Sequence, residues 1–268
     1  MEFARPQNLD EALEAKAEMP STQLLAGGTD LMVEVNLANH RPEAIVALNR
    51  VSELQDLDER RIGAGVRWQQ LESSSHRALA QLARTIGSPQ IRNAGTIGGN
   101  IGTASPAGDG LPWLAALDAG IEVAGRDRGS RLVPWSEFFT GVKRTSLEPD
   151  EIVTAAVLPE EIPIRQEFAK VGIRSAMVIS TVAAVVVRYD DGRVRIALGS
   201  VAPTPMRAYE AEKMISDEQR PSEAALAEFA RRVSTEVRPI TDHRSTEEYR
   251  RHAAGVLARR LLERCMAA

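Results

Sequence analysis

The chain has 268 residues, enough for one large domain or two ordinary ones. Apolar residues make up 43% and charged residues 26%, as in folded, water-soluble proteins, and the net charge of −4 gives no basic field favouring nucleic acid. The single cysteine, Cys265, excludes an internal disulfide and an iron–sulfur cluster ligated by this chain alone. The four histidines lack metal-ligand spacing, so no metal site is predicted. No leader or membrane-spanning run is visible, so a cytoplasmic protein without a membrane span is expected.

The first elements predict a strand that turns into a helix through two glycines. Asn8 and Glu11 have capping-box spacing and predict a helix that ends before Pro20. Residues 23–26 read as a short buried strand, Gly27 and Gly28 turn the chain, and Thr29 or Asp30 can cap the next helix. This order places free N–H groups beside a helix start, which suits an anion. From this turn alone, an ordinary strand-to-helix connection is an equal alternative.

The next segments alternate between strands and helices. Residues 44–48 and 61–66 predict strands, and residues 77–86 have helical spacing. Trp68 stands where a dinucleotide-binding fingerprint would need its third glycine, so that motif is absent. The leucines at 111, 114 and 117, followed by Ile121, predict a helix running into a strand.

The most unusual stretch is residues 93–109, where five of 17 residues are glycine and almost nothing is bulky. Glycine lets the main chain approach a ligand closely, and successive free N–H groups can surround an anion. The stretch is predicted to be a loop. Our hypothesis is that it and the turn at residues 26–30 clamp one large, phosphate-bearing cofactor.

The last third of the chain has a different pattern. Residues 159–163 are polar and flanked by prolines, as in a connecting loop. Residues 181–189 and 194–201 predict two strands joined by a hairpin turn at residues 190–193. Ser222 predicts the start of one helix, and Ser245 with Glu248 forms a capping box for the last. An antiparallel sheet backed by helices is expected.

Catalytic signatures of hydrolases, zinc proteases and P-loop enzymes are missing, so no catalytic residue is predicted. The glycine-rich segments contain no base; Asp30 and Asp109 are suited to accept hydrogen bonds from a cofactor. The bound cofactor would then carry the chemistry.

Seven segments together resemble the FAD-binding medium subunit of the xanthine dehydrogenase/molybdenum hydroxylase family, in its carbon monoxide dehydrogenase medium subunit-like form. They are residues 24–31, 89–101, 103–109, 135–141, 147–153, 168–174 and 244–251. The second of these, around Gly98 and Gly99, is highly specific, and the others support it.

The resemblance implies an α+β fold. A two-lobed FAD-binding domain of the PCMH/vanillyl-alcohol-oxidase type would occupy residues 1–162, with lobes at about 1–55 and 56–162. A C-terminal domain of antiparallel sheet and helices would occupy residues 163–268.

The resemblance also implies the cofactor-binding residues. Two segments would bind the pyrophosphate and ribityl parts of FAD, Ile86 and Val153 would lie against its rings, and Asp109 and Lys170 would make polar contacts. The residues of the two segments are Leu24, Leu25, Ala26, Gly27, Gly28, Thr29, Asp30 and Leu31, then Thr96, Ile97, Gly98, Gly99 and Asn100.

Lys170 also has a physical rationale, because an ammonium group would stabilise the negative charge of a reduced flavin. The residues alone favour the alternative of a surface lysine on a strand. The chain departs from the family pattern just beyond Arg174: many members carry Asp-Ile-Ala where this chain has Val178, Ile179 and Ser180.

The function implied is that of an oxidoreductase subunit that passes electrons from 2Fe–2S clusters in a partner, through FAD, to an external acceptor. A small iron–sulfur subunit and a large molybdopterin subunit would be the partners, in a dimer of heterotrimers. Two alternatives are a stand-alone FAD-dependent reductase or oxidase of the same fold, and a non-redox module that binds a sugar nucleotide.

Overall fold

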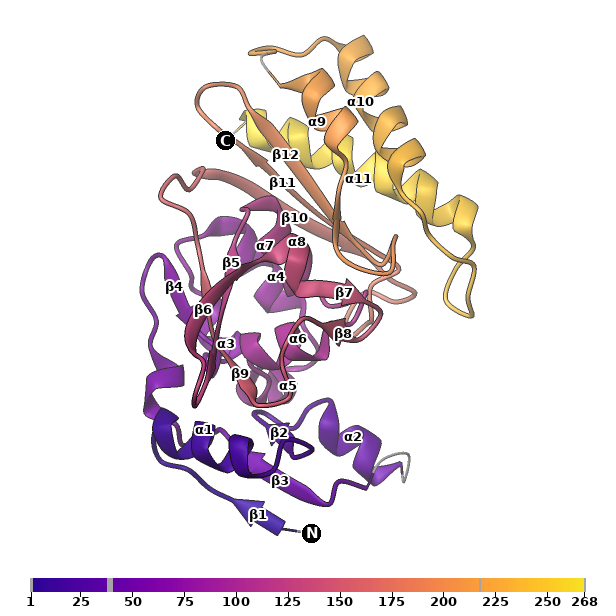
Figure 1. Cartoon of the computed structure of the whole chain (residues 1–268). Helices are drawn as coiled ribbons and strands as arrows, with labels where there is room; N and C mark the ends of the chain where they lie inside the picture. Colours follow the sequence, from indigo (N-terminus) through magenta and orange to yellow (C-terminus); the bar gives the residue numbers. More distant parts are fainter. Residues whose placement is uncertain (1, 38–40, 217, 268) are drawn as a thin grey trace.

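The computed structural model describes residues 2–37, 41–216 and 218–267. Three parts of the chain are stacked in sequence order, with the N-terminus at one end of the molecule and the last helices at the other (Figure 1). Each part is built around its own sheet. The predicted α+β class is confirmed.

The N-terminal part is a small parallel sheet with two helices. Its strands are β1 (Glu2–Ala4), β2 (Gln23–Leu25) and β3 (Ala44–Ala47), in the order β1-β3-β2, and its helices are α1 (Leu9–Glu18) and α2 (Leu31–Asn36). The predicted cap of α1 is confirmed, since the Asn8 side chain accepts a hydrogen bond from the Glu11 N–H at 2.9 Å. The Glu11 carboxylate reaches back to the N–H of Gln7 rather than that of Asn8.

The middle part holds an antiparallel sheet in the order β4-β9-β5-β6 and most of the short helices. The strands are β4 (Arg61–Gly63), β5 (Gly120–Gly125), β6 (Gly129–Pro134) and β9 (Glu151–Val157), with a separate pair β7 (Phe139–Gly141) and β8 (Arg144–Thr145). The helices are η1 (Ser52–Gln55), α3 (Trp68–Leu71), α4 (Arg77–Thr85), α5 (Pro89–Ala94), α6 (Ile97–Thr103), α7 (Gly110–Ala116) and α8 (Trp135–Phe138).

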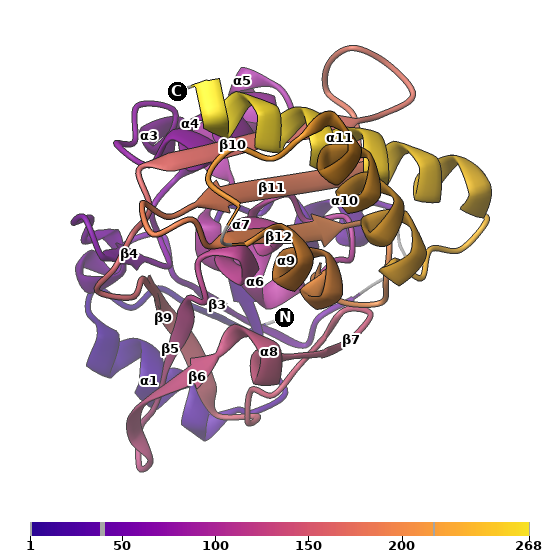
Figure 2. The same ribbon diagram turned by 90° about the horizontal axis from the view of Figure 1, so that it is seen from above.

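The C-terminal part is the predicted antiparallel sheet backed by helices. Its strands, in the order β10-β11-β12-β13, are β10 (Arg165–Val171), β11 (Val182–Arg188), β12 (Val194–Gly199) and β13 (Met206–Arg207). The helices α9 (Tyr209–Ile215), α10 (Glu223–Glu236) and α11 (Glu247–Ala267) lie over one face of it (Figure 2). Ser222 caps α10 as predicted. The cap of α11 is one residue later than predicted, because Thr246, not Ser245, accepts from the N–H of Tyr249.

Strand β11 explains how this sheet joins the rest of the molecule. Its residues alternate between two hydrophobic cores: Val182, Ala184 and Val186 face the C-terminal helices. Ala183, Val185 and Val187 belong to the core that also contains the helices of the middle part. Helix α7 packs against β11 on this second face, and α4 packs against the neighbouring strand β10. The strand is therefore apolar from Val182 to Val187, because both of its faces are covered.

Candidate functional site

The first glycine turn runs between the end of β2 at Leu25 and the start of α2 at Leu31. Gly28 has φ +70°, a left-handed conformation that glycine adopts without strain. A Cβ atom at Gly27 would lie 1.9 Å from the carbonyl oxygen of Ala94, which belongs to the second glycine-rich segment. The two predicted halves of the clamp are therefore in direct contact, and Gly27 is what lets them meet.

The main-chain donors of this turn have no hydrogen-bond partner in the part of the chain that the structure describes. None of the hydrogen bonds between described residues involves the N–H of Gly27, Gly28, Thr29 or Asp30. Residues 27–29 are half-buried and Asp30 is exposed. Four successive N–H groups in a turn with a left-handed glycine form a concave donor surface that suits a phosphate.

Asp30 does not cap α2 with its side chain, contrary to one of the two predicted possibilities. Its carboxylate instead accepts a hydrogen bond at 3.2 Å from the hydroxyl of Thr103, at the end of α6. This bond is a second link between the two glycine-rich segments.

The second segment is a helix, not the predicted loop, over Ile97–Thr103. Thr96 caps it, accepting from the N–H of Gly99 at 3.0 Å. The N–H groups of Ile97 and Gly98 donate to the carbonyls of Val66 and Ala64, at 3.0 and 2.9 Å. The main-chain donors of Ile97, Gly98 and Gly99 are thus satisfied within the protein. Binding of a cofactor by this segment stays a prediction.

The glycines of α6 have two different roles. A Cβ atom at Gly98 would lie 2.5 Å from the carbonyl oxygen of Ala64, so Gly98 allows the helix to pack closely against the segment that contains Ala64. A Cβ atom at Gly99 would approach only the Thr96 hydroxyl, at 3.2 Å, and one at Gly102 would meet nothing within 4 Å. Gly99 and Gly102 therefore leave bare main chain on the open side of α6.

Asp109 and Lys170 are brought together across 61 residues of sequence. The Lys170 ammonium lies 2.6 Å from Asp109 Oδ2, and less than a tenth of either side chain is exposed. It also donates to the carbonyls of Thr85, at 3.0 Å, and Val178, at 3.3 Å. All three ammonium donors are thus used, and the alternative of a surface lysine was wrong.

Ser180 was not predicted as a site residue. Its hydroxyl donates to Oδ1 of Asp109, on the other side of the carboxylate from Lys170. The only sequence signal was the departure from the family pattern at Val178–Ser180, where Ser180 replaces an alanine.

The remaining predicted residues lie around this group in varied environments. Leu24, Leu25, Ala26, Leu31 and Ile86 are half-buried. Asn100 Oδ1 accepts from the N–H of Gly110, which ties α6 to α7 beside Asp109. Val153 is buried in β9, the strand against which α6 packs. The roles of these residues toward a cofactor stay predictions.

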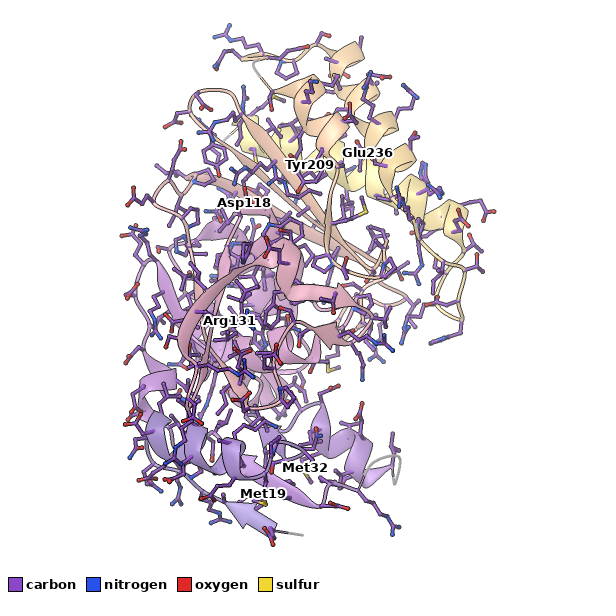
Figure 3. All side chains as sticks on the ribbon, in the orientation of Figure 1. Met19, Met32, Asp118, Arg131, Tyr209 and Glu236 are labelled. Carbon is purple, nitrogen blue, oxygen red and sulfur yellow. The ribbon has the colours of Figure 1, made fainter. Side chains whose placement is uncertain are left out.

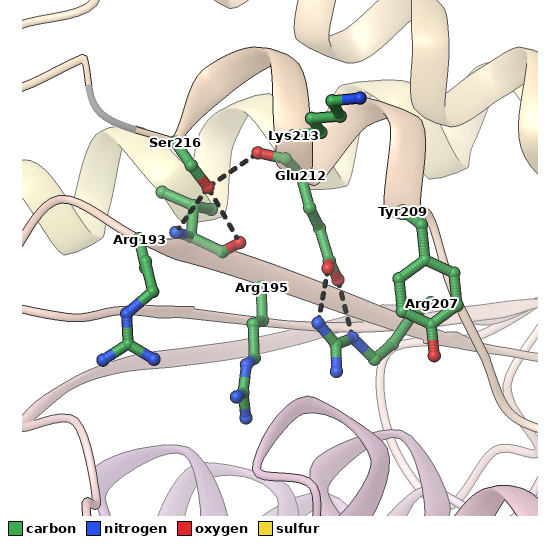
Figure 4. A pocket seen from close by; sticks show the side chains of 8 residues that line it. Arg193, Arg195, Arg207, Tyr209, Glu212, Lys213 and Ser216 are labelled. Carbon is green, nitrogen blue, oxygen red and sulfur yellow. Dashed lines mark hydrogen bonds and ion pairs between the residues drawn. The ribbon is translucent and has the colours of Figure 1, made fainter.

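A cavity of about 310 Å³ lies elsewhere, between β12 and α9 (Figure 4). It is lined by Arg193, Val194, Arg195, Arg207, Tyr209, Glu212, Lys213 and Ser216. Its three guanidinium groups are already paired with carboxylates, Arg207 with Glu212 at 2.5 Å among them. Asp118 holds two of them from the middle part, and Figure 3 shows it at the junction below Tyr209. We interpret this cavity as part of the contact between the sheets.

None of the helices in the described residues is long and apolar enough to span a membrane.

Two family models match the chain. Residues 1–161 match the FAD binding domain in molybdopterin dehydrogenase, and residues 167–265 match the CO dehydrogenase flavoprotein C-terminal domain. The xanthine dehydrogenase FAD-binding subunit of Escherichia coli O157:H7 is 32% identical over 282 residues, covering 99% of this chain and 96% of that protein. The nicotinate dehydrogenase FAD-subunit of Eubacterium barkeri is 34% identical over 235 residues, covering 80% and 79%.

The solved structures include a close match to the whole fold. Carbon monoxide dehydrogenase from Hydrogenophaga pseudoflava, in a form that lacks the Mo-pyranopterin moiety of its molybdenum cofactor, matches with a TM-score of 0.91 at 30% identity. The match covers 100% of this chain and 97% of that one. The expected architecture, a two-lobed FAD-binding domain followed by a C-terminal sheet with helices, is confirmed. The chain belongs to the family of FAD-binding flavoprotein subunits of molybdenum-containing dehydrogenases, which are oxidoreductases.

Proposed function

We propose that this chain holds FAD between its two glycine-rich segments and relays electrons from 2Fe–2S clusters of a partner subunit to an external acceptor. One observation carries the placement: four adjoining, unused N–H groups at residues 27–30 lie next to a helix that presents bare main chain at Gly99 and Gly102. The chemistry fits FAD, because a diphosphate needs clustered donors and a bulky cofactor needs a surface free of side chains.

Each part of the site has a proposed task. The N–H groups of residues 27–30 would bind the pyrophosphate, and the open side of α6 would lie against the ribityl chain. Asp30 and Asp109 would accept hydrogen bonds from hydroxyl or N–H groups of the cofactor. Lys170 donates all three of its N–H groups to the protein, so it would act through Asp109 rather than by direct contact. Bound FAD supplies the redox chemistry.

The remaining proposed contacts come from the segments that resemble the family. These are residues 24–26, Leu31, Ile86, residues 96–100 and Val153. We place the boundary between the FAD-binding and C-terminal domains near residue 162, in the connection between β9 and β10.

The proposed partners are a small iron–sulfur subunit and a large molybdopterin subunit, assembled as a dimer of heterotrimers in the cytoplasm. The support is that relatives covering nearly the whole chain carry names such as FAD-binding subunit and medium chain. Co-purification of the native complex tests this. Isolation of a single chain that turns over a small substrate would favour the stand-alone reductase or oxidase instead.

The FAD site is tested by filling the open face of α6. Gly99→Val should abolish retention of FAD, measured from the visible spectrum after reconstitution, because the side chain would occupy the proposed cofactor space. Gly141→Val is the matched control: it lies in β7, where a Cβ atom comes no closer than 3.7 Å to its neighbours. The proposal fails if the unaltered chain takes up no FAD, and the placement fails if Gly99→Val binds it normally.

A further inference from the structure

The Asp109 carboxylate is held from two sides by residues of the C-terminal part. Lys170, in β10, contacts Oδ2, and the hydroxyl of Ser180, just before β11, donates to Oδ1. Ser180 is only 1% exposed, and its hydroxyl makes no other hydrogen bond to a described residue. A fully buried hydroxyl used for one carboxylate fixes the orientation of that carboxylate.

Ser180 is itself fixed by the main chain around it. Its carbonyl accepts a hydrogen bond at 2.9 Å from the hydroxyl of Ser200, which follows β12. The N–H of Ser200 donates at 2.7 Å to the carbonyl of Pro106, three residues before Asp109. Ser200 thus bonds both the main chain of Ser180 and the segment that leads into Asp109.

The last helix, α11, also contacts the main chain around Ser180. The guanidinium of Arg250, in α11, is buried and donates at 2.8 Å to the carbonyls of both Thr181 and Ser200. Its other end is paired with Asp242 at 2.7 Å. The main chain at Ser180 and Thr181 is therefore held by two separate stretches of the C-terminal part, the end of β12 and α11.

We propose that Ser180 is a positioning residue for the cofactor, acting by holding the Asp109 carboxylate in a fixed orientation and drawing part of its negative charge away from the bound flavin. This inference rests on the proposed FAD site. An alanine at this position, as in the Asp-Ile-Ala pattern of many family members, has no hydroxyl with which to make the bond. With serine at position 180, the Asp109 carboxylate shares its negative charge with a hydroxyl; with alanine it would not.

The size of the effect follows from the type of bond. A hydrogen bond to a charged group is worth enough to change a binding constant by roughly tenfold when it is lost. Removing the donor also leaves the carboxylate more negative toward the cofactor. Because reduction adds negative charge to the flavin, the reduced form is then disfavoured.

The test compares Ser180→Ala, Ser180→Thr and a control in the full chain reconstituted with FAD. Ser180→Ala should raise the FAD dissociation constant about tenfold and shift the flavin midpoint potential to a more negative value. Ser180→Thr keeps the hydroxyl and should restore both quantities. Ser234→Ala removes a serine hydroxyl that donates to the Ala230 carbonyl within α10 and makes no hydrogen bond to the Asp109 group, so it should change neither.

The outcomes separate this inference from the proposed function. If the unaltered chain binds FAD and Ser180→Ala leaves both the affinity and the potential unchanged, the inference is overturned and the proposed function stands. An affinity loss shared equally by the Ser234→Ala control, without a shift in potential, overturns it too. If the unaltered chain binds no FAD, the proposed function fails first.

A second variant serves if Ser180→Ala does not fold. Ser180→Cys has a weaker thiol donor and is expected to shift the FAD dissociation constant and the midpoint potential in the same directions. An unshifted constant and potential would overturn the inference.

Discussion

Gly27→Ala tests whether the contact between the two glycine-rich segments holds the fold together. The added methyl group would lie 1.9 Å from the Ala94 carbonyl oxygen, 2.5 Å from the Ala94 carbonyl carbon and 2.9 Å from the Gly95 Cα atom. All three are main-chain atoms, so no side chain can rotate away, and the segments have to separate. Overpacking of this kind costs about 1–3 kcal/mol.

Part of that cost is offset, because alanine reduces the freedom of the unfolded chain by about 0.4–1 kcal/mol. The expected net loss is therefore roughly 1–2 kcal/mol of unfolding free energy. It is measured as a lower urea midpoint for the cofactor-free chain, with the slope of the transition compared to confirm that the same surface unfolds.

The control adds the same methyl group where it meets nothing. Gly102→Ala, in α6, has no neighbour within 4 Å and should raise the unfolding free energy by up to about 1 kcal/mol through helix propensity. The two alanine variants should thus move in opposite directions. A Gly27→Ala chain with an unchanged midpoint would refute the close contact between the segments.

Two further predictions concern charges outside the glycine-rich segments. Asp118→Ala should lower the melting temperature by an amount equivalent to about 1 kcal/mol, since it removes the ion pairs with Arg195 and Arg207 across the contact between the middle and C-terminal parts. The difference from the unaltered chain should shrink in 1 M salt, and a salt-independent loss would contradict an ionic role. Burial opposes the charge on Asp242, but hydrogen bonds from the N–H groups of Arg244 and Ser245 and from the Arg250 guanidinium outweigh it and lower the pKa of this carboxyl to about 2. A lowered pKa in the folded state gives stability that is complete above the unfolded value near 4 and is lost as the pH falls toward 2. Between pH 4 and pH 2, the unfolding free energy of Asp242→Asn should therefore fall by roughly 1 kcal/mol less than that of the unaltered chain. Equal slopes of unfolding free energy against pH for the two chains would contradict the assignment.

The sequence predicted best the features that depend on nearest neighbours. The helix starts at Asn8 and Ser222 were correct because a cap and its partner lie three residues apart. The hairpin at residues 190–193 was also correct, for the same local reason. The last helix shows the limit of this approach, because two adjacent residues, Ser245 and Thr246, are both good caps and packing decides between them.

The glycine-rich segment was predicted wrongly as a loop because its helix depends on distant residues. Three glycines in seven residues disfavour a helix in isolation. The main chain at Ala64 and Val66 satisfies the first N–H groups of α6, and Gly98 fits against it. Composition drew attention to the segment, but its conformation depends on a neighbour more than 30 residues away in the sequence.

In the candidate site, too, local features were predicted from the sequence and contacts between distant residues were not. The resemblance predicted cofactor contacts for Asp109 and Lys170, but not that the two side chains form a buried pair. Spacing along the chain carries no information about a contact across 61 residues, and Ser180 entered only as a departure from a pattern. The unused N–H groups at residues 27–30 were anticipated because a turn with adjacent glycines seldom satisfies its own donors.

The alternation of β11 between two cores bears on how this protein could be engineered. The two family models meet near residue 161, yet Ala183, Val185 and Val187 are in the same hydrophobic core as the helices of the first matched region. Cutting the chain at the sequence boundary would expose a strip of valine and alanine on one fragment and the facing side of α7 on the other. A fragment from either side should therefore aggregate or recombine with its complement, so exchanging flavin domains between relatives requires moving β10–β12 together with the helices they cover.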